Sequence, residues 1–194
     1  MTGPALDSLA PADAFGLLER AICYALGSVQ AVTSDRLAAR TPCPDWDLGA
    51  LLQHVNESLT ALCECVHTDP TPGTEATNPA GVFRARATRL IGAFSSHPCR
   101  NVVFAAGYPL AMRLIAATGA IEIAVHGWDV AQTTGQLRPI PNGLAHDLLW
   151  VCPLIAADAE QHRLFAPPIP LPASSTVSDQ LVALLGRRPT GDSN

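Results

Sequence analysis

Apolar residues recur along most of the chain at the three- and four-residue spacing that places them on one face of a helix. Six stretches show this pattern and are predicted to be helices: 11–39, 48–67, 79–96, 109–134, 141–161 and 178–185. Asp47 is a natural N-cap for the second stretch, and Gly135 a natural C-cap for the fourth. Several helices joined by short connections predict an all-α helical bundle.

The segments between these stretches read as connectors. Thr41–Trp46 holds two prolines that fix the backbone and disfavour helix, so we expect a rigid link there. Residues 68–78 are predicted to be a loop, 102–109 a short extended segment or turn, and 166–176 an extended proline-rich segment. No internal repeat divides the chain, and we expect one domain over residues 1–194.

Composition excludes several classes of function. Apolar residues make up 48% of the 194 residues and charged residues only 15%, which argues against general disorder. The net charge is −5 and the arginines are scattered, which argues against a nucleic-acid partner. The chain contains no lysine, so a phosphate-loop lysine, a Schiff base and a Ser–Lys pair are excluded.

The chain carries no pattern that predicts export or a membrane. Met1–Leu9 lacks the basic and apolar parts of a signal peptide. The longest apolar stretch, 114–131, is interrupted by Glu122, His126 and Asp129, so we interpret it as a buried helix. The six cysteines are irregularly spaced, which favours reduced thiols and a cytoplasmic protein.

The fourth helical stretch carries the chemistry. With Glu122 set at zero, His126 falls at about 40°, Asp129 at about 340° and Thr133 at about 20° on a helical wheel. The rest of this helix is apolar nearly all round, which predicts burial. A buried carboxylate next to a buried imidazole needs a partner, and a divalent metal would supply one.

His54 is a candidate for a third metal ligand. It lies outside the polar arc of its own helix, on the side predicted to face the core. Helical bundles build metal sites from side chains on facing helices in this way. Two alternatives stay open: Glu122 and His126 as a hydrogen-bonded core pair, and His54 as an ordinary core histidine.

Four neighbouring residues have more than one interpretation. Asp129 is predicted to lie behind the metal and to orient a ligand imidazole or a substrate donor, or else to bond the backbone or Trp46. Trp46 and Trp128 are interpreted as core packing, with a wall of the substrate site as the alternative. Cys43 is interpreted as packing, although its place before a helix N-terminus is one where the pKa of a thiol can fall.

Two longer patterns contain these residues. Residues 41–54 read T-x-C-x-x-W-x-x-x-x-L-x-x-H, and 122–131 read E-x-x-x-H-G-W-D-h-A, where h is apolar. Both resemble signatures of the mycothiol-dependent maleylpyruvate isomerase N-terminal domain family, within the DinB-like metal-binding superfamily. Residues 170–189 are similar to the closing segment of its single-domain members.

This resemblance implies an up-and-down four-helix bundle with short additional C-terminal helices. It implies a divalent metal, usually zinc, held by His54, Glu122 and His126. It also implies a low-molecular-weight thiol, often mycothiol, that takes part in thiol transfer or in isomerisation of a small electrophile. The isomerases carry a further C-terminal domain that this sequence does not show.

Three ligands leave one coordination position open, which is typical of a catalytic zinc site. Two imidazoles and one carboxylate also suit iron, and nickel and manganese stay open. The expected partners are a small thiol and a small electrophile, with no nucleic acid or membrane, in a monomer or homodimer. A non-catalytic metal-binding accessory or stress protein, or a metal-dependent tailoring enzyme that uses no thiol, remain the alternatives.

Overall fold

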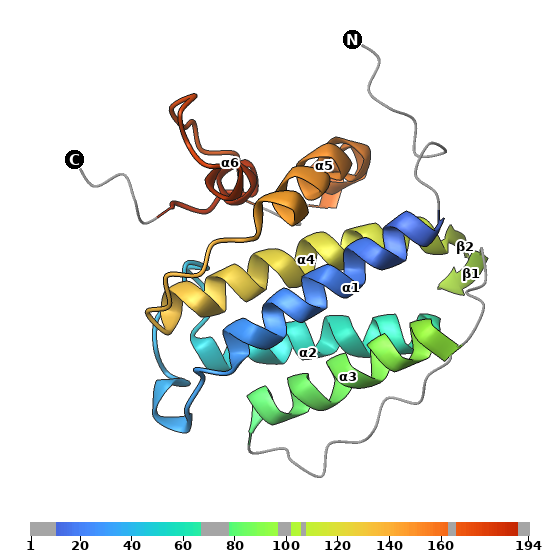
Figure 1. The fold of residues 1–194 in the computed structure, drawn as a ribbon, viewed down its shortest axis with the longest axis horizontal. Helices are drawn as coiled ribbons and strands as arrows, with labels where there is room; N and C mark the ends of the chain where they lie inside the picture. The colour runs from blue at the N-terminus through green and yellow to red at the C-terminus, as the bar shows by residue number, and fades with distance from the viewer. Residues whose placement is uncertain (1–10, 67–77, 97–101, 106–107, 163–165, 190–194) are drawn as a thin grey trace.

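The computed structural model describes residues 11–66, 78–96, 102–105, 108–162 and 166–189. Within these residues the chain forms six α-helices, a short 3-10 helix at Ser34–Arg36 and a two-stranded hairpin (Figure 1). The helices are α1 (Pro11–Val29), α2 (Leu48–Cys65), α3 (Pro79–Ser96), α4 (Met112–Thr133), α5 (Asn142–His162) and α6 (Val177–Leu184). The prediction of an all-helical bundle is confirmed.

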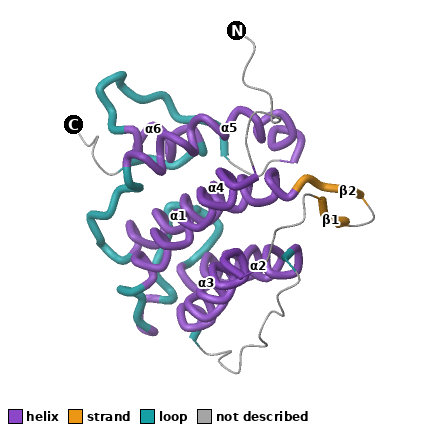
Figure 2. The backbone as a smooth tube through the Cα atoms, turned by 45° about the vertical axis from the view of Figure 1, so that its right-hand side comes forward, coloured by secondary structure: helices purple, strands orange, loops and turns teal. Residues whose placement is uncertain are grey.

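Helices α1 to α4 form the core, with α4 packed between α1 and α2. The colour gradient of Figure 1 shows that α1 and α4 run in one direction, and α2 and α3 in the opposite one. Helices α2 and α3 are therefore parallel, so their order departs from the strict up-and-down arrangement that the resemblance implied. They are joined through 67–77, which lie outside the described residues. Helices α5 and α6 pack on each other over α4 and α1, on the side away from α3 (Figure 2).

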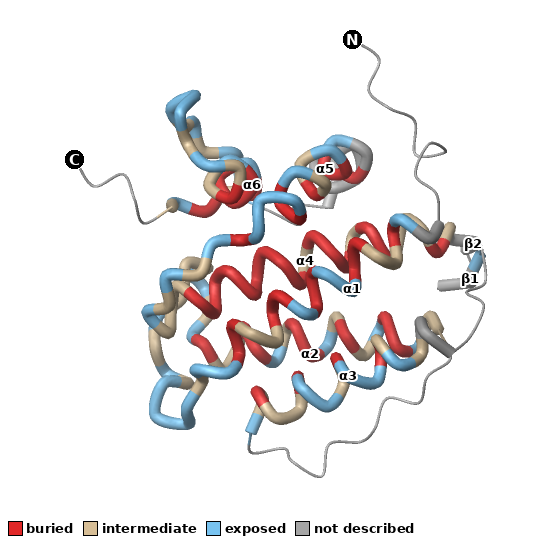
Figure 3. The backbone as a smooth tube through the Cα atoms, in the orientation of Figure 1, coloured by how far each residue is buried: buried red, intermediate tan, exposed pale blue. Residues whose placement is uncertain are grey.

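Helix α4 is buried along most of its length (Figure 3). It contacts α1 closely at Gly127, where an added Cβ would lie 3.0 Å from both the Cα and the Cβ of Ala25. Helix α4 is long and apolar enough to cross a membrane, but 78% of its most apolar window is buried inside the protein. Such burial is what the core helix of a bundle shows.

The first helix ends ten residues earlier than predicted, at Val29 rather than near Ala39. Backbone N–H groups at the start of α2 donate to the carbonyls of Leu37 and Ala39, at 2.8 and 3.0 Å. Residues 37–39 must therefore turn back toward α2, which a continuous helix would not allow. The exposed positions 30 and 31 also give the helix no face to bury.

The segment before α4 is a hairpin, so the predicted helix start near Pro109 is wrong. Strand β1 (Val102–Ala105) pairs antiparallel with β2 (Tyr108–Ala111), and Pro109 lies opposite Phe104 in this register. The helix begins at Met112, directly after the strand. A proline is tolerated here because both strands are at the edge of a two-stranded sheet.

The predicted helix caps are confirmed. The Asp47 carboxylate accepts a hydrogen bond from the backbone N–H of Ala50 at 2.8 Å, at the start of α2. Gly135 follows α4 with a φ of 75°, a backbone conformation that residues other than glycine rarely adopt. The first cap fixes the start of α2, which carries His54, and the second fixes the end of α4, which carries Glu122.

Candidate metal centre

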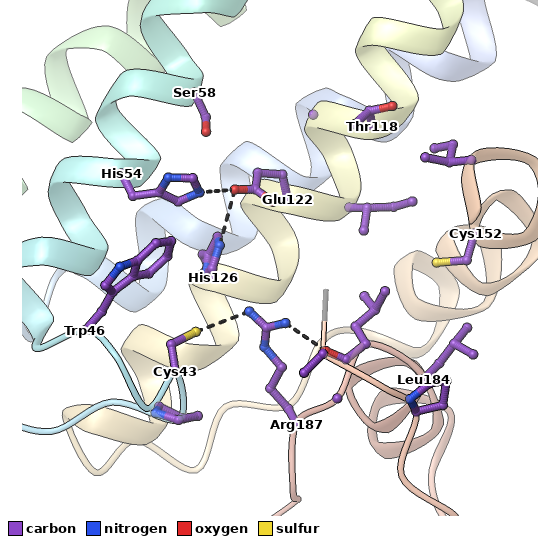
Figure 4. A pocket seen from close by; sticks show the side chains of 18 of the residues that line it. Cys43, Trp46, His54, Ser58, Thr118, Glu122, His126, Cys152, Leu184 and Arg187 are labelled. Carbon is purple, nitrogen blue, oxygen red and sulfur yellow. Dashed lines mark hydrogen bonds and ion pairs between the residues drawn. The ribbon is translucent and has the colours of Figure 1, made fainter. Parts of the chain in front are cut away.

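The structure brings His54, Glu122 and His126 together from two facing helices (Figure 4). One nitrogen or oxygen atom from each lies within 4.8 Å of the others. The Nε2 atom of His126 is 3.2 Å from Oε1 of Glu122, and Nε2 of His54 contacts that same oxygen. The rings of the two histidines are nearly perpendicular, at 82°.

This donor set suits a divalent transition metal. It offers two imidazole nitrogens and one carboxylate, a common set in catalytic zinc sites. Its exposure is graded, from 4% for the side chain of His126 to 19% for Glu122 and 35% for His54. The buried side anchors the cluster, and the open side faces a cavity where a further ligand has access.

The three groups also set each other's protonation in the absence of a metal. Burial alone would raise the pKa of Glu122, but hydrogen bonds from His126 and His54 hold it below its usual range. Burial alone would lower the pKa of His126, but hydrogen bonds to Asp129, Cys43 and Glu122 raise it well above 6.5. At neutral pH the metal-free cluster therefore pairs a carboxylate with an imidazolium, and a metal would replace the proton.

Asp129 lies behind His126, as predicted for an orienting residue. Its Oδ2 atom accepts a hydrogen bond from Nδ1 of His126 at 2.9 Å, and its side chain is fully buried. This bond fixes the ring so that Nε2 points toward Glu122. The geometry is that of the carboxylate–histidine pairs found behind metal ions.

Arg187 completes this network and was not among the residues selected from the sequence. It follows α6, and its Nη2 atom lies 3.2 Å from Oδ2 of Asp129 and 3.3 Å from Sγ of Cys43. Its Nη1 atom donates to the carbonyl of Leu185 at 2.8 Å. Burial alone would lower the pKa of Arg187, but the charge of Asp129 raises it, so the guanidinium stays charged.

The proline-rich connector shapes the other side of the site. The hydroxyl oxygen of Thr41 accepts from the backbone N–H of Cys43 at 3.1 Å and lies 2.8 Å from the carbonyl oxygen of Trp46. The turn places the Trp46 ring 4.5 Å from the His54 ring and Sγ of Cys43 3.4 Å from Asp129. The spacing of Thr, Cys and Trp in this motif thus has a structural reason.

The structure adds contacts to two of these interpretations. Trp46 is partly buried against the core, as predicted, but it also faces the histidines and lines the cavity. Cys43 packs against the core and is hydrogen-bonded within the network. Trp128, by contrast, is a core residue with 2% exposure, as predicted.

A second group of possible metal ligands consists of Cys43, His126 and Asp129. It shares His126 with the first group but uses the ring's other nitrogen. The guanidinium of Arg187 touches both Cys43 and Asp129, so a cation placed there would meet a positive charge at close range. The electrostatics therefore favour His54, Glu122 and His126 as the metal-binding group.

His54, Glu122 and His126 lie in the wall of a large cavity of about 1530 Å³. One wall consists of α2, α4 and the connector at 42–46. The opposite wall consists of α5, residues 166–168 and the end of α6, and Figure 4 shows Cys152 and Leu184 across from the histidines. The cavity thus gives a small molecule access to the open side of the cluster.

Comparison with known protein families gives one match. Residues 18–131 match the family described as mycothiol maleylpyruvate isomerase N-terminal domain. Comparison with curated proteins and with solved structures gives no match. The match includes the two histidines, Glu122 and Asp129, whereas α5, α6 and Arg187 lie beyond it. It covers more than half of the chain and agrees with the site geometry, so the chain belongs to the mycothiol maleylpyruvate isomerase N-terminal domain family.

Proposed function

We propose that this protein is a divalent-metal-dependent enzyme that binds a low-molecular-weight thiol of the mycothiol type. The reaction is thiol transfer to, or thiol-assisted isomerisation of, a small electrophile. One observation carries the proposal: His54, Glu122 and His126 converge at the wall of a cavity that can admit a ligand. Family membership supports the choice of a thiol.

A divalent ion bound by these three residues would retain an open position and would hold a thiol there in its ionised form. Zinc is the ion that this donor set suits best. The remaining tasks fall to the chain itself. Glu122 supplies one negative charge, which leaves the loaded cluster with a net charge near +1 to attract a thiolate. Asp129 accepts a hydrogen bond from Nδ1 of His126 and keeps Nε2 of that ring directed at the metal position.

Two further residues protect this arrangement. Arg187 pairs with the fully buried carboxylate of Asp129 and offsets its negative charge. Trp46 covers the His54 ring and limits the access of water from the connector side. The thiol therefore approaches from the cavity, where the electrophile also has room.

The metal site can be tested on untagged protein by elemental analysis. We expect about one equivalent of a divalent metal in the wild type, and its loss in His54→Ala and Glu122→Ala. His146→Ala is the matched control, because this histidine is exposed and lies on α5 outside the cavity lining. Unchanged metal content in both site variants would eliminate the proposal.

The thiol is tested next, by calorimetry with mycothiol, glutathione and cysteine. We expect saturable binding of one of them to the metal-loaded protein and none to Glu122→Ala. A turnover screen with electrophilic acceptors then measures transfer or isomerisation. A loaded protein that binds no thiol would instead be a non-catalytic metal protein or a thiol-independent enzyme.

A further inference from the structure

The cavity is larger than one small ligand requires. Its volume of about 1530 Å³ exceeds the roughly 300–1,000 Å³ of most small-molecule sites. A thiol whose sulfur lies at His54, Glu122 and His126 would occupy the wall formed by α2 and α4. Space remains against the opposite wall for a second molecule.

That opposite wall is almost entirely apolar. It is formed by side chains from α5, from the segment before α6 and from the C-terminal end of α6: Cys152, Ile155, Pro167, Pro168, Leu184 and Leu185. Burial raises the pKa of the Cys152 thiol to about 12, so this group is neutral and adds no charge. Binding of a molecule here is favoured by the burial of apolar surface, and the wall offers that molecule few hydrogen-bond partners.

The charges in the cavity also favour an apolar ligand. Arg187 is the only arginine among the described residues that line it, and its guanidinium already contacts Asp129, Cys43 and the carbonyl of Leu185. Asp45 adds a negative charge at the connector. Once a bound thiolate has neutralised the metal-loaded cluster, a substrate with two carboxylates would need two further counter-charges, and the described lining supplies no such pair.

Leu184 gives an independent indication. Its neighbour Leu185 is 6% exposed, whereas Leu184 lines the cavity and is 37% exposed. A large apolar side chain left partly in water at the wall of a cavity marks a surface that a ligand can cover. Covering it would favour binding of an apolar ligand and not of a charged one.

We propose that the electrophile bound here has an apolar aromatic or alkyl body and at most one charge. Its body packs against α5, residues 166–168 and the end of α6, with the reactive end toward His54 and Glu122. This inference rests on the proposed function, because it assigns the second substrate of the same site. It excludes small dicarboxylates as the main substrates.

Binding is tested with N-phenyl-1-naphthylamine, a neutral dye that fluoresces in apolar surroundings. We expect saturable binding to the metal-loaded protein. Leu184→Glu should weaken it about tenfold, because a carboxylate would face the apolar wall. Leu137→Glu is the matched control: Leu137 is 99% exposed and lies outside the cavity lining, so binding should change less than about twofold. Equal effects of the two variants would overturn the proposal.

Competition distinguishes the substrate classes. Decanoate, with an alkyl body and one charge, should displace the dye from the wild type. Maleate, a small dicarboxylate, should not displace it even at a hundredfold higher concentration. Displacement by maleate at concentrations similar to decanoate would overturn the proposal.

The same assay separates this inference from the proposed function. In His54→Ala the metal should be lost while the dye still binds, because the apolar wall does not contain that residue. A wild-type protein that binds the dye at the Leu184 wall but takes up no metal would defeat the metal-dependent function alone. Metal and thiol binding without dye binding would defeat the apolar-substrate inference alone.

Discussion

The two sides of helix α4 contrast sharply. Toward α1 the helices are in such close contact that Gly127 leaves no room for a Cβ beside Ala25. Toward α5 and α6 the same helix borders a cavity of about 1530 Å³ that exposes Glu122. The tightly packed side holds the backbone in place, and the open side uses that fixed backbone to present ligands. A rigid support of this kind is what a metal site of defined geometry requires.

The largest expected effect comes from breaking the buried network on the open side. Asp129→Ala leaves the guanidinium of Arg187 buried without its carboxylate, so the free energy of unfolding should fall by about 3–5 kcal/mol. Metal affinity should fall about 10- to 100-fold, because His126 loses the partner that orients it. Urea unfolding and metal competition measure the two effects.

Asp129→Asn is the control for this prediction. An amide oxygen can still accept a hydrogen bond, so the loss of stability should be smaller than for alanine, while metal affinity still falls. Unchanged stability in Asp129→Ala would mean that the buried ion pair does not support the fold.

The packed side should respond differently. Gly127→Ala forces a Cβ against Ala25 and should lower the free energy of unfolding by about 1–3 kcal/mol, despite the better helix propensity of alanine. Metal affinity of the folded variant should stay within about threefold of wild type if the two sides act separately. Thermal unfolding and metal titration check this, and a large loss of metal affinity would show that they are coupled.

The pH dependence of metal binding tests only the side of α4 that faces the cavity. The pKa of His126 is raised in the metal-free protein, so at neutral pH a proton must leave before metal binds. Below that raised pKa, metal affinity should fall about tenfold per pH unit, or 1.4 kcal/mol. Calorimetry in buffers of different ionisation enthalpy should detect proton release on binding, and a pH-independent affinity between pH 6 and 8 would contradict this.

The same shifts set the stability of the metal-free protein. Because the pKa of His126 is raised on folding, its protonation stabilises the fold. This stabilisation is fully present below pH 6.5 and is lost as the pH rises through the folded-state pKa. Because the pKa of Glu122 is lowered on folding, its ionised form stabilises the fold. This stabilisation is present above pH 4.5 and is lost as the pH falls through the folded-state pKa. The stabilisation that metal adds should therefore grow between pH 6 and 8, as measured by the shift in Tm.

The smallest effect is expected away from both sides of α4. Asp47→Ala removes the N-cap of α2 and should cost about 1 kcal/mol. Because His54 lies almost two turns into the helix, metal affinity should change little. This variant supplies the baseline for a purely local loss, measured by urea unfolding. A loss as large as that of Asp129→Ala would mean that the connector and the buried network act as one unit.

Much of the fold could be predicted because its signals are local. The start of α2 is marked by Asp47 and the end of α4 by Gly135, and both residues act through their own backbone neighbours. The end of α1 could not be predicted, since it depends on residues 37–39 bonding to α2. The extended segment before α4 was predicted, but its pairing into a hairpin was not, because strand pairing depends on a partner segment and not on periodicity.

The candidate site shows the same division. Glu122 and His126 share one helical face, so their proximity followed from spacing alone, and His54 followed from its place outside the polar arc of its helix. Arg187 is 58 residues from Asp129 in the sequence, and no spacing rule connects them. An arginine after a short apolar helix gives no local signal, and only the packing of α6 over the bundle reveals its role.

The apolar wall of the cavity lies outside the stretch that defines the family, whereas His54, Glu122 and His126 lie inside it. If the proposed function holds, substitutions at Ile155 or Leu184 should alter which substrates bind while His54, Glu122 and His126 stay unchanged. In the proposed enzyme, the C-terminal third of the chain is therefore the region where engineering or evolution would change the range of substrates. Arg187 limits that freedom, because it ties this wall to Asp129.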